Sequence, residues 1–101
     1  FHMLYRVLLQ GKEACILNEN NRITLHKNGF TKKREQLFGK YISFLPFFGE
    51  VTGVTLSGVK YPLSGNTLTA GNSLGISNEG LEEEMKVSFT SGYLLMIEAR
   101  D

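Results

Sequence analysis

Several features that would point to a partner or a cofactor are scarce in this sequence. Cys15 is the only cysteine, which excludes an internal disulfide and a cysteine-based zinc site and favours the reducing cytoplasm. Eleven basic residues against ten acidic ones leave a formal charge of +1, so charge gives no reason to expect nucleic acid or an acidic membrane as a partner. No apolar run approaches the roughly 20 residues of a transmembrane helix, and no signal-peptide pattern is found. We therefore expect a cytoplasmic protein with neither a membrane nor a nucleic-acid partner.

Motifs of catalysis are also missing. No glycine-rich loop opens a helix, and no Ser-His-Asp, Cys-His or metal-ligand set has usable spacing. His26 lies beside Arg22 with no carboxylate or second histidine at ligand spacing, which favours a surface position over catalysis or metal binding. The glutamates at 82–84 are consecutive, and consecutive side chains of an extended backbone cannot converge on one magnesium ion. We predict a solvated turn there, and no catalytic or metal-binding residue in this chain.

What the sequence does contain is a series of short apolar runs typical of β-strands. With 42% hydrophobic residues in 101, the chain has the size of one domain with a small core. Alternating runs predict a hairpin over 14–27, a strand over 41–48 that ends or lies at an edge at Pro46, and a strand over 85–91. The run 93–100 is apolar on both faces in its first half, which indicates a central strand. About eight to ten strands without helical crossovers predict an all-β fold, an antiparallel, jelly-roll-like β-sandwich.

Three other segments carry local predictions. Met3 to Gln10 has the apolar spacing of a short helix. Residues 1–11 are expected to be a cloning scar followed by the tail of an upstream domain. The basic run at 32–35 is predicted to be a solvated loop rather than a phosphate contact. Phe47 and Phe48 are assigned to core packing, with an exposed aromatic lip as the alternative.

Residues 50–78 hold five of the eleven glycines among runs of Val, Leu, Thr and Ile, a pattern typical of irregular β-structure. If 73–78 is extended, Ser73, Gly75 and Ser77 share one face, where the missing side chain of glycine would let a flat ring approach the backbone. Asn78 would offer a donor and an acceptor at the strand end. The alternative, favoured by composition alone, is that these Ser and Asn residues only satisfy turn backbone.

Three longer runs occur in a fixed order: EVTGVTLSGVKYPL from Glu50, LTAGNSLGISNE from Leu68 and SGYLLMIEARD from Ser91. In sequence and spacing they closely resemble the carboxyl-terminal, thiamine-binding domain of bacterial thiamine pyrophosphokinase. The resemblance extends over residues 12–101, which we take as the thiamine-binding β-sandwich domain, and it assigns residues 1–11 to the end of an absent nucleotide-binding domain.

The resemblance implies a function. Enzymes of this family transfer a diphosphoryl group from ATP to thiamine, giving thiamine diphosphate and AMP, and their sandwich domains form a homodimer. ATP and Mg2+ are bound by the nucleotide domain, so this domain alone would be inactive. By resemblance, Ser77 and Asn78 would bind the aminopyrimidine of thiamine, with Leu74 and Gly75 shaping the pocket beside Ser73.

One departure from the family pattern concerns the ring that stacks on thiamine. Animal members place an aromatic residue just after the matching Ser-Asn pair, whereas here the sequence continues with residues 79–81, Glu-Gly-Leu. The stacking partner must come from elsewhere or be absent. The alternative function is a non-catalytic β-sandwich module for dimerisation or interaction. A carbohydrate-binding sandwich is a weaker alternative, because the chain has no Trp.

Overall fold

The protein is an antiparallel β-structure in which one long strand belongs to both layers. The computed structural model describes residues 15–17, 20–72 and 74–100, so the helix predicted at 3–10 lies outside the described residues. The elements are β1 (Cys15–Leu17), β2 (Asn21–His26), β3 (Phe30–Lys33), the 3-10 helix η1 (Arg34–Gln36), β4 (Tyr41–Ser57), β5 (Leu63–Leu68), β6 (Asn78–Glu79), β7 (Glu84–Ser88) and β8 (Ser91–Ala99). In the described parts of the chain, no helix is long or apolar enough to cross a membrane.

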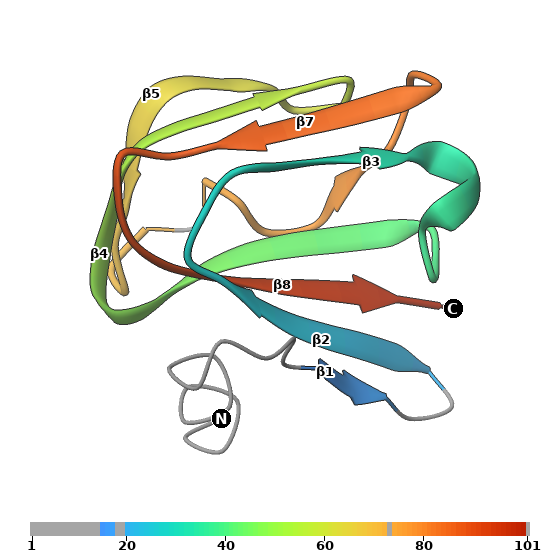
Figure 1. The fold of residues 1–101 in the computed structure, drawn as a ribbon, viewed down its shortest axis with the longest axis horizontal. Coiled ribbons are helices and arrows are strands. Elements are labelled where there is room, and N and C mark those ends of the chain that lie inside the picture. The colour runs from blue at the N-terminus through green and yellow to red at the C-terminus, as the bar shows by residue number, and fades with distance from the viewer. Residues whose placement is uncertain (1–14, 18–19, 73, 101) are drawn as a thin grey trace.

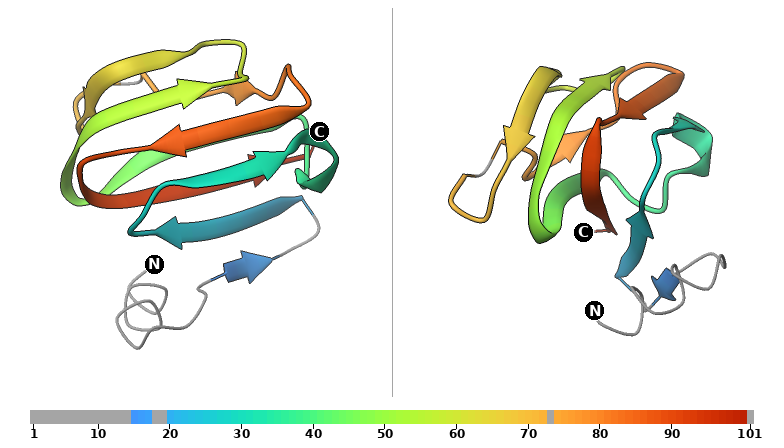
Figure 2. Two further views of the ribbon diagram at one scale, coloured as in Figure 1. Left: turned by 45° about the horizontal axis from the view of Figure 1, so that its top comes forward. Right: turned by 60° about the vertical axis from the view of Figure 1, so that its left-hand side comes forward.

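The strand order is β1-β2-β8-β4-β7-β3, with β5 and β6 as further partners of β4. Strand β4 has 17 residues. Its first half pairs with β8 and β6, and its second half pairs with β5 and β7. Figures 1 and 2 show β4 bending from the layer of β1, β2 and β8 into the layer of β3, β7 and β5. The two layers therefore form one sheet that curls on itself, as the all-β, sandwich-like prediction required.

The bend of β4 follows Pro46, where the strand was predicted to end or to lie at an edge. The prediction that the strand ends at Pro46 is wrong, because Pro46 pairs in register with Leu94 of β8 and the strand continues to Ser57. The edge position is confirmed for the described residues, since the other partners of β4 begin only at Val51 or stop at Ile42. The pairing with β8 shifts register between Phe47 and Thr52, and such an irregularity bends a strand.

Two apolar clusters lie on the sheet. The larger one fills the space between the layers and contains Ile42, Phe44, Val51, Val54, Leu56, Val59, Leu68, Met85, Val87, Leu94 and Met96. The smaller one is built around Leu25 and Leu95, with Ile23, Leu45, Phe47, Tyr93 and Ile97 packed against it. Alternate residues of β8 belong to different clusters. The central position predicted for this strand is confirmed, because β8 pairs with both β2 and β4. Of the alternating strand predicted for 85–91, the part up to Ser88 is confirmed as β7, which ends there.

Two local predictions need correction. The run 32–35 is not a loop, because Lys32 and Lys33 belong to β3, which pairs with β7, and Arg34 begins η1. Phe48 is exposed rather than packed in the core, whereas Phe47 is partly buried in the smaller cluster. Phe48 also has a positive φ of 58°, which places it in the irregular part of β4. The side chains at 82–84 are exposed as predicted, although Glu84 already begins β7.

Candidate functional site

The segment predicted to bind a ligand is a turn and not an extended strand. Residues 74–77 form turns, and only Asn78 and Glu79 pair as strand β6. Ser77 has a φ of 57°, in the left-handed region that a regular strand does not use. Ser73 lies outside the described residues. The predicted common face of Gly75 and Ser77 is therefore wrong, because the backbone between them does not alternate.

The turn is bound tightly to the first half of β4. The backbone N–H of Phe44 donates to the carbonyl of Gly75 at 2.8 Å, and the N–H of Ser77 donates to the hydroxyl of Ser43 at 3.1 Å. A Cβ on Gly75 would lie 2.5 Å from the carbonyl oxygen of Phe44, so glycine is needed for this approach. The sequence predicted that a flat ring approaches the backbone at Gly75, but in the structure β4 occupies that position.

Anchoring on one side leaves apolar side chains exposed on the other. Leu74 and Ile76 are each 45% exposed, and Ser77 between Ile76 and the buried Asn78 is also exposed. A surface of two aliphatic side chains beside a hydroxyl can hold a flat ring and bond to its polar edge. We call residues 74–78 the recognition turn.

Asn78 holds the recognition turn to a second segment of the chain. Its side chain is fully buried, with 0% exposure. Its Oδ1 accepts from the N–H of Tyr61 at 2.9 Å, and its Nδ2 donates to the carbonyl of the same residue at 2.8 Å. The N–H of Glu79 donates to Oδ1 as well, at 3.0 Å. In this structure a direct bond from Asn78 to a ligand would require Tyr61 to move aside.

Charged and aromatic side chains surround Glu79 next to the turn. Its carboxylate lies 3.2 Å from the ammonium of Lys60 and 3.7 Å from that of Lys40. Each lysine also lies over a neighbouring ring, Lys60 over Tyr61 at 5.5 Å and Lys40 over Tyr41 at 5.4 Å from the centroid. The hydrogen bond to Glu79, followed by the charge of Tyr61, raises the pKa of Lys60. The cluster therefore carries one net positive charge beside two exposed rings.

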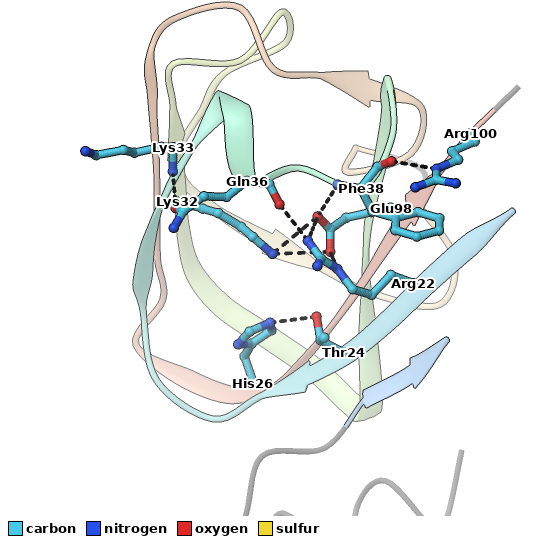
Figure 3. Close-up of polar contacts among 9 residues, drawn as sticks. All are labelled: Arg22, Thr24, His26, Lys32, Lys33, Gln36, Phe38, Glu98 and Arg100. Atoms are coloured by element: carbon cyan, nitrogen blue, oxygen red, sulfur yellow. Dashed lines mark hydrogen bonds and ion pairs between the residues drawn. The ribbon is translucent and has the colours of Figure 1, made fainter. Parts of the chain in front are cut away.

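A second polar cluster, formed by side chains of β2, β3 and β8, was missed by the sequence analysis. Glu98 is fully buried and accepts from Nε and Nη2 of Arg22 at 2.8 and 2.7 Å, from Lys32 at 3.3 Å and from the N–H of Phe38 at 3.1 Å (Figure 3). Burial alone would raise the pKa of Glu98, but these hydrogen bonds and the two positive charges outweigh burial and lower it. A signal for this cluster existed, because Glu98 is the one acidic residue in an otherwise apolar run, SGYLLMIEA.

His26 lies at the other end of β2 from Arg22 and is half-buried, whereas the sequence predicted a position at the surface. Its ring stacks on Phe30 with centroids 4.0 Å apart, and its Nε2 is hydrogen-bonded to the hydroxyl of Thr24 at 2.9 Å. Burial, followed by the charge of Lys32, lowers its pKa to about 4, although Glu98 opposes this shift. The ring is neutral near pH 7 and serves packing. Among the described residues, no group of three His, Cys, Asp or Glu side chains could hold a metal ion.

Comparisons with a family model and with curated proteins identify the same family. Residues 27–94 match the family model described as "Thiamin pyrophosphokinase, vitamin B1 binding domain". The thiamine pyrophosphokinase of Bacillus subtilis (strain 168) is 32% identical over 99 residues, which are 98% of this chain and 46% of that protein. This chain therefore spans about half the length of the curated relative that it matches.

Solved structures agree with the sequence comparison. The crystal structure of thiamine pyrophosphokinase from Bacillus subtilis superimposes with a TM-score of 0.91 and 31% identity, over 99% of this chain and 47% of that chain. The enzyme from Geobacillus thermodenitrificans gives a TM-score of 0.85 at 31% identity, over 99% and 46%. Both matches include the whole curled sheet.

Proposed function

The chain belongs to the family of thiamin pyrophosphokinase vitamin B1 binding domains, and from this premise we propose that it is the thiamine-binding part of a thiamine pyrophosphokinase. The observation that carries the proposal is the family match, which includes both β4 and the recognition turn. Residues 12–101 would form the thiamine-binding domain. This chain covers only 46% of the Bacillus subtilis enzyme, so the complete reaction of that enzyme is part of the proposal.

The proposed thiamine site is the recognition turn, with Leu74, Gly75, Ser77 and Asn78 as its residues, together with Ser73. Three features support it. The exposed leucine and isoleucine side chains of the turn offer apolar surface for the planar rings of thiamine. Ser77 is exposed as well, and its hydroxyl can donate to or accept from a ring edge. The Gly75 carbonyl and the Ser77 N–H are bonded to the Phe44 N–H and the Ser43 hydroxyl of β4, and such anchoring lowers the cost of ordering the turn on binding.

The proposed reaction is transfer of a diphosphoryl group from ATP to the hydroxyl of thiamine, giving thiamine diphosphate and AMP. The contribution of this chain would be to fix the thiamine rings, so that the hydroxyl is held in line with the phosphorus that it attacks. In the residues that the structure describes, no acidic cluster suits a magnesium ion. We propose that these residues hold neither Mg2+ nor ATP and that the chain alone is inactive.

We also propose that the chain forms a homodimer through its sheet. The smaller apolar cluster supports this, because it lies on the face of β2, β4 and β8 opposite the main core and includes the partly buried Ile23, Leu45, Phe47, Tyr93 and Ile97. Sedimentation equilibrium should show a dimer at micromolar concentration, and Leu45→Glu should give a monomer. Thr55→Glu, at an exposed position on the other layer, is the control and should remain dimeric.

Calorimetric titration of the chain with thiamine tests the binding proposal. We expect saturable binding, which weakens on Ser77→Ala and is unchanged by Ser88→Ala, an exposed hydroxyl on β7. A stable dimer with no detectable thiamine binding and no thiamine effect on the melting temperature would instead favour a non-catalytic dimerisation module.

A further inference from the structure

We propose that Lys40 and Lys60 form a phosphoryl-binding subsite beside the recognition turn, which takes the phosphate group of a thiamine phosphate ester. This inference rests on the proposed function and names a second ligand of the same site. Thiamine itself is a cation and offers no anionic group to a pair of ammonium groups. A thiamine phosphate ester combines the same rings with an anion.

The charge of the lysine cluster is the first observation. The two ammonium groups share a single carboxylate, because Oε2 of Glu79 lies 3.2 Å from Nζ of Lys60 and Oε1 lies 3.7 Å from Nζ of Lys40. In the described part of the chain, neither lysine has a second carboxylate partner. One positive charge is therefore not balanced by the protein. An ammonium group that donates to Glu79 also keeps further N–H donors for a ligand.

The exposure of the same three side chains is the second observation. Those of Lys40 and Lys60 are 62% and 48% exposed, whereas that of Glu79 is only 18% exposed. An anion can therefore reach both ammonium groups from solution. The carboxylate that would repel this anion is the least accessible member of the cluster.

Backbone pairing ties both lysines to the end of the recognition turn. Glu79 directly follows Asn78, and its N–H donates to Oδ1 of Asn78 at 3.0 Å. The N–H of Lys60 donates to the carbonyl of Glu79 at 2.8 Å. Tyr41, which follows Lys40, pairs in register with Glu79. Both lysines therefore belong to segments that are paired with the residue directly after the turn.

The position of the phosphate in the ester fits this arrangement. Thiamine carries its hydroxyl on the thiazolium side of the molecule, at the end opposite the aminopyrimidine, and the esters carry their phosphate there. Ser77, the proposed contact of the aminopyrimidine, lies two residues before Glu79, which is a span of at most about 7 Å along the chain. A ligand whose aminopyrimidine is bound at Ser77 can therefore extend its phosphate toward the lysines.

The Glu98 cluster has the same charge count and suits a phosphate less well. There Arg22 and Lys32 share one carboxylate, as the two lysines share Glu79. The side chains of these cations are only 25% and 22% exposed, and Glu98 is fully buried. A ligand would have to displace a buried carboxylate that also accepts from the N–H of Phe38. Exposure therefore distinguishes the two clusters.

Calorimetry on the full chain tests the subsite with thiamine, thiamine monophosphate and inorganic diphosphate. The monophosphate should bind about fivefold more tightly than thiamine at low salt, the size expected for two exposed charge contacts. This ratio should approach one at about 0.5 M NaCl, where exposed charges are screened. Inorganic diphosphate should bind more weakly than the ester because it lacks the rings. Binding of diphosphate as tight as that of the ester would overturn the link to the recognition turn.

Three substitutions separate a ligand role from a structural one. Lys40→Met and Lys60→Met should each lower the ratio of the two dissociation constants about twofold to threefold. Glu79→Gln removes the carboxylate from both ammonium groups and should raise the ratio. A purely structural role of the ion pairs would move all three variants in the same direction. Lys27→Met removes an exposed lysine from the turn between β2 and β3 and should leave the ratio unchanged.

The outcomes distinguish this subsite from the proposed function. Equal affinities for thiamine and its monophosphate at low salt would overturn the subsite and leave the proposed function standing. A ratio that stays the same in both lysine variants would overturn it as well. A lack of binding of both thiamine and its monophosphate would overturn the subsite and the proposed function together.

Discussion

Replacing Glu98 with glutamine is expected to lower the free energy of unfolding by about 2 to 4 kcal/mol. The change keeps the shape of the side chain and removes its charge. Glu98 is fully buried and accepts bonds from Arg22, Lys32 and the N–H of Phe38. Breaking a buried ion pair costs about 3 to 5 kcal/mol, because a charge is left without its partner. The expected loss is somewhat smaller than this, because glutamine retains one acceptor oxygen and the side chains of Arg22 and Lys32 are partly exposed.

Equilibrium unfolding in urea measures this loss, and thermal unfolding gives an independent value. For a domain of about 100 residues, 1 kcal/mol corresponds to roughly 4 to 8 °C in Tm. Glu79→Gln is the matched control, because Glu79 also faces two cations, Lys40 and Lys60, but is 18% exposed and pairs with lysines that are largely exposed. Surface pairs contribute about 0 to 1 kcal/mol.

The burial of Glu98, rather than the number of its partners, sets the size of this loss. Equal losses in Glu98→Gln and Glu79→Gln would refute this claim, as would a Glu98→Gln protein that is as stable as the unmodified chain. A change in the urea m-value would indicate that the substitution alters the denatured state or the two-state behaviour as well.

Two further perturbations follow from single residues. The pKa of His26 is lowered from 6.5 to about 4. Below pH 6.5 the unfolded chain takes up a proton at this residue and the folded chain does not. The free energy of unfolding should therefore be highest above pH 6.5 and fall by up to about 3 kcal/mol toward pH 4. His26→Gln should flatten this part of the stability profile measured by urea unfolding. Gly75→Ala should cost about 1 to 3 kcal/mol and weaken thiamine binding, since its Cβ would meet the Phe44 carbonyl at 2.5 Å. Gly71→Ala, whose Cβ has no neighbour closer than 3.9 Å, should change the melting temperature by only a few degrees.

The strands were predictable where burial alone dictates the sequence. Met85 and Val87 alternate with polar residues because one face of β7 packs on the core. The apolar first half of the last strand, from Tyr93, predicted a central position because β8 contributes to both clusters. The effect of Pro46 was harder to predict. Proline lacks an N–H, which excludes it from a strand only where a neighbouring strand needs that donor, and on that side β4 is an edge of the sheet.

The recognition turn shows where alternation misleads. Ser, Gly and Asn occur in strands at edges and in turns, so the pattern at 73–78 could not decide between them. The deciding contacts are long-range: Ser77 with Ser43, 34 residues apart, and Asn78 with Tyr61, 17 residues apart. The Glu98 cluster has the same origin, because its partner Arg22 is 76 residues away. No local window contains either arrangement.

The central claim is that thiamine binds at the recognition turn beside Tyr61, and the most direct measurement is the mapping of thiamine-induced amide shifts by NMR on the isotope-labelled chain. The largest saturable shifts should fall on residues 74–79 and on residues 60–61, which are hydrogen-bonded to Asn78 and Glu79. Amides around Glu98, at the other polar cluster, should stay unchanged. Shifts concentrated at that cluster, or an absence of saturable shifts at 74–79, would contradict the account.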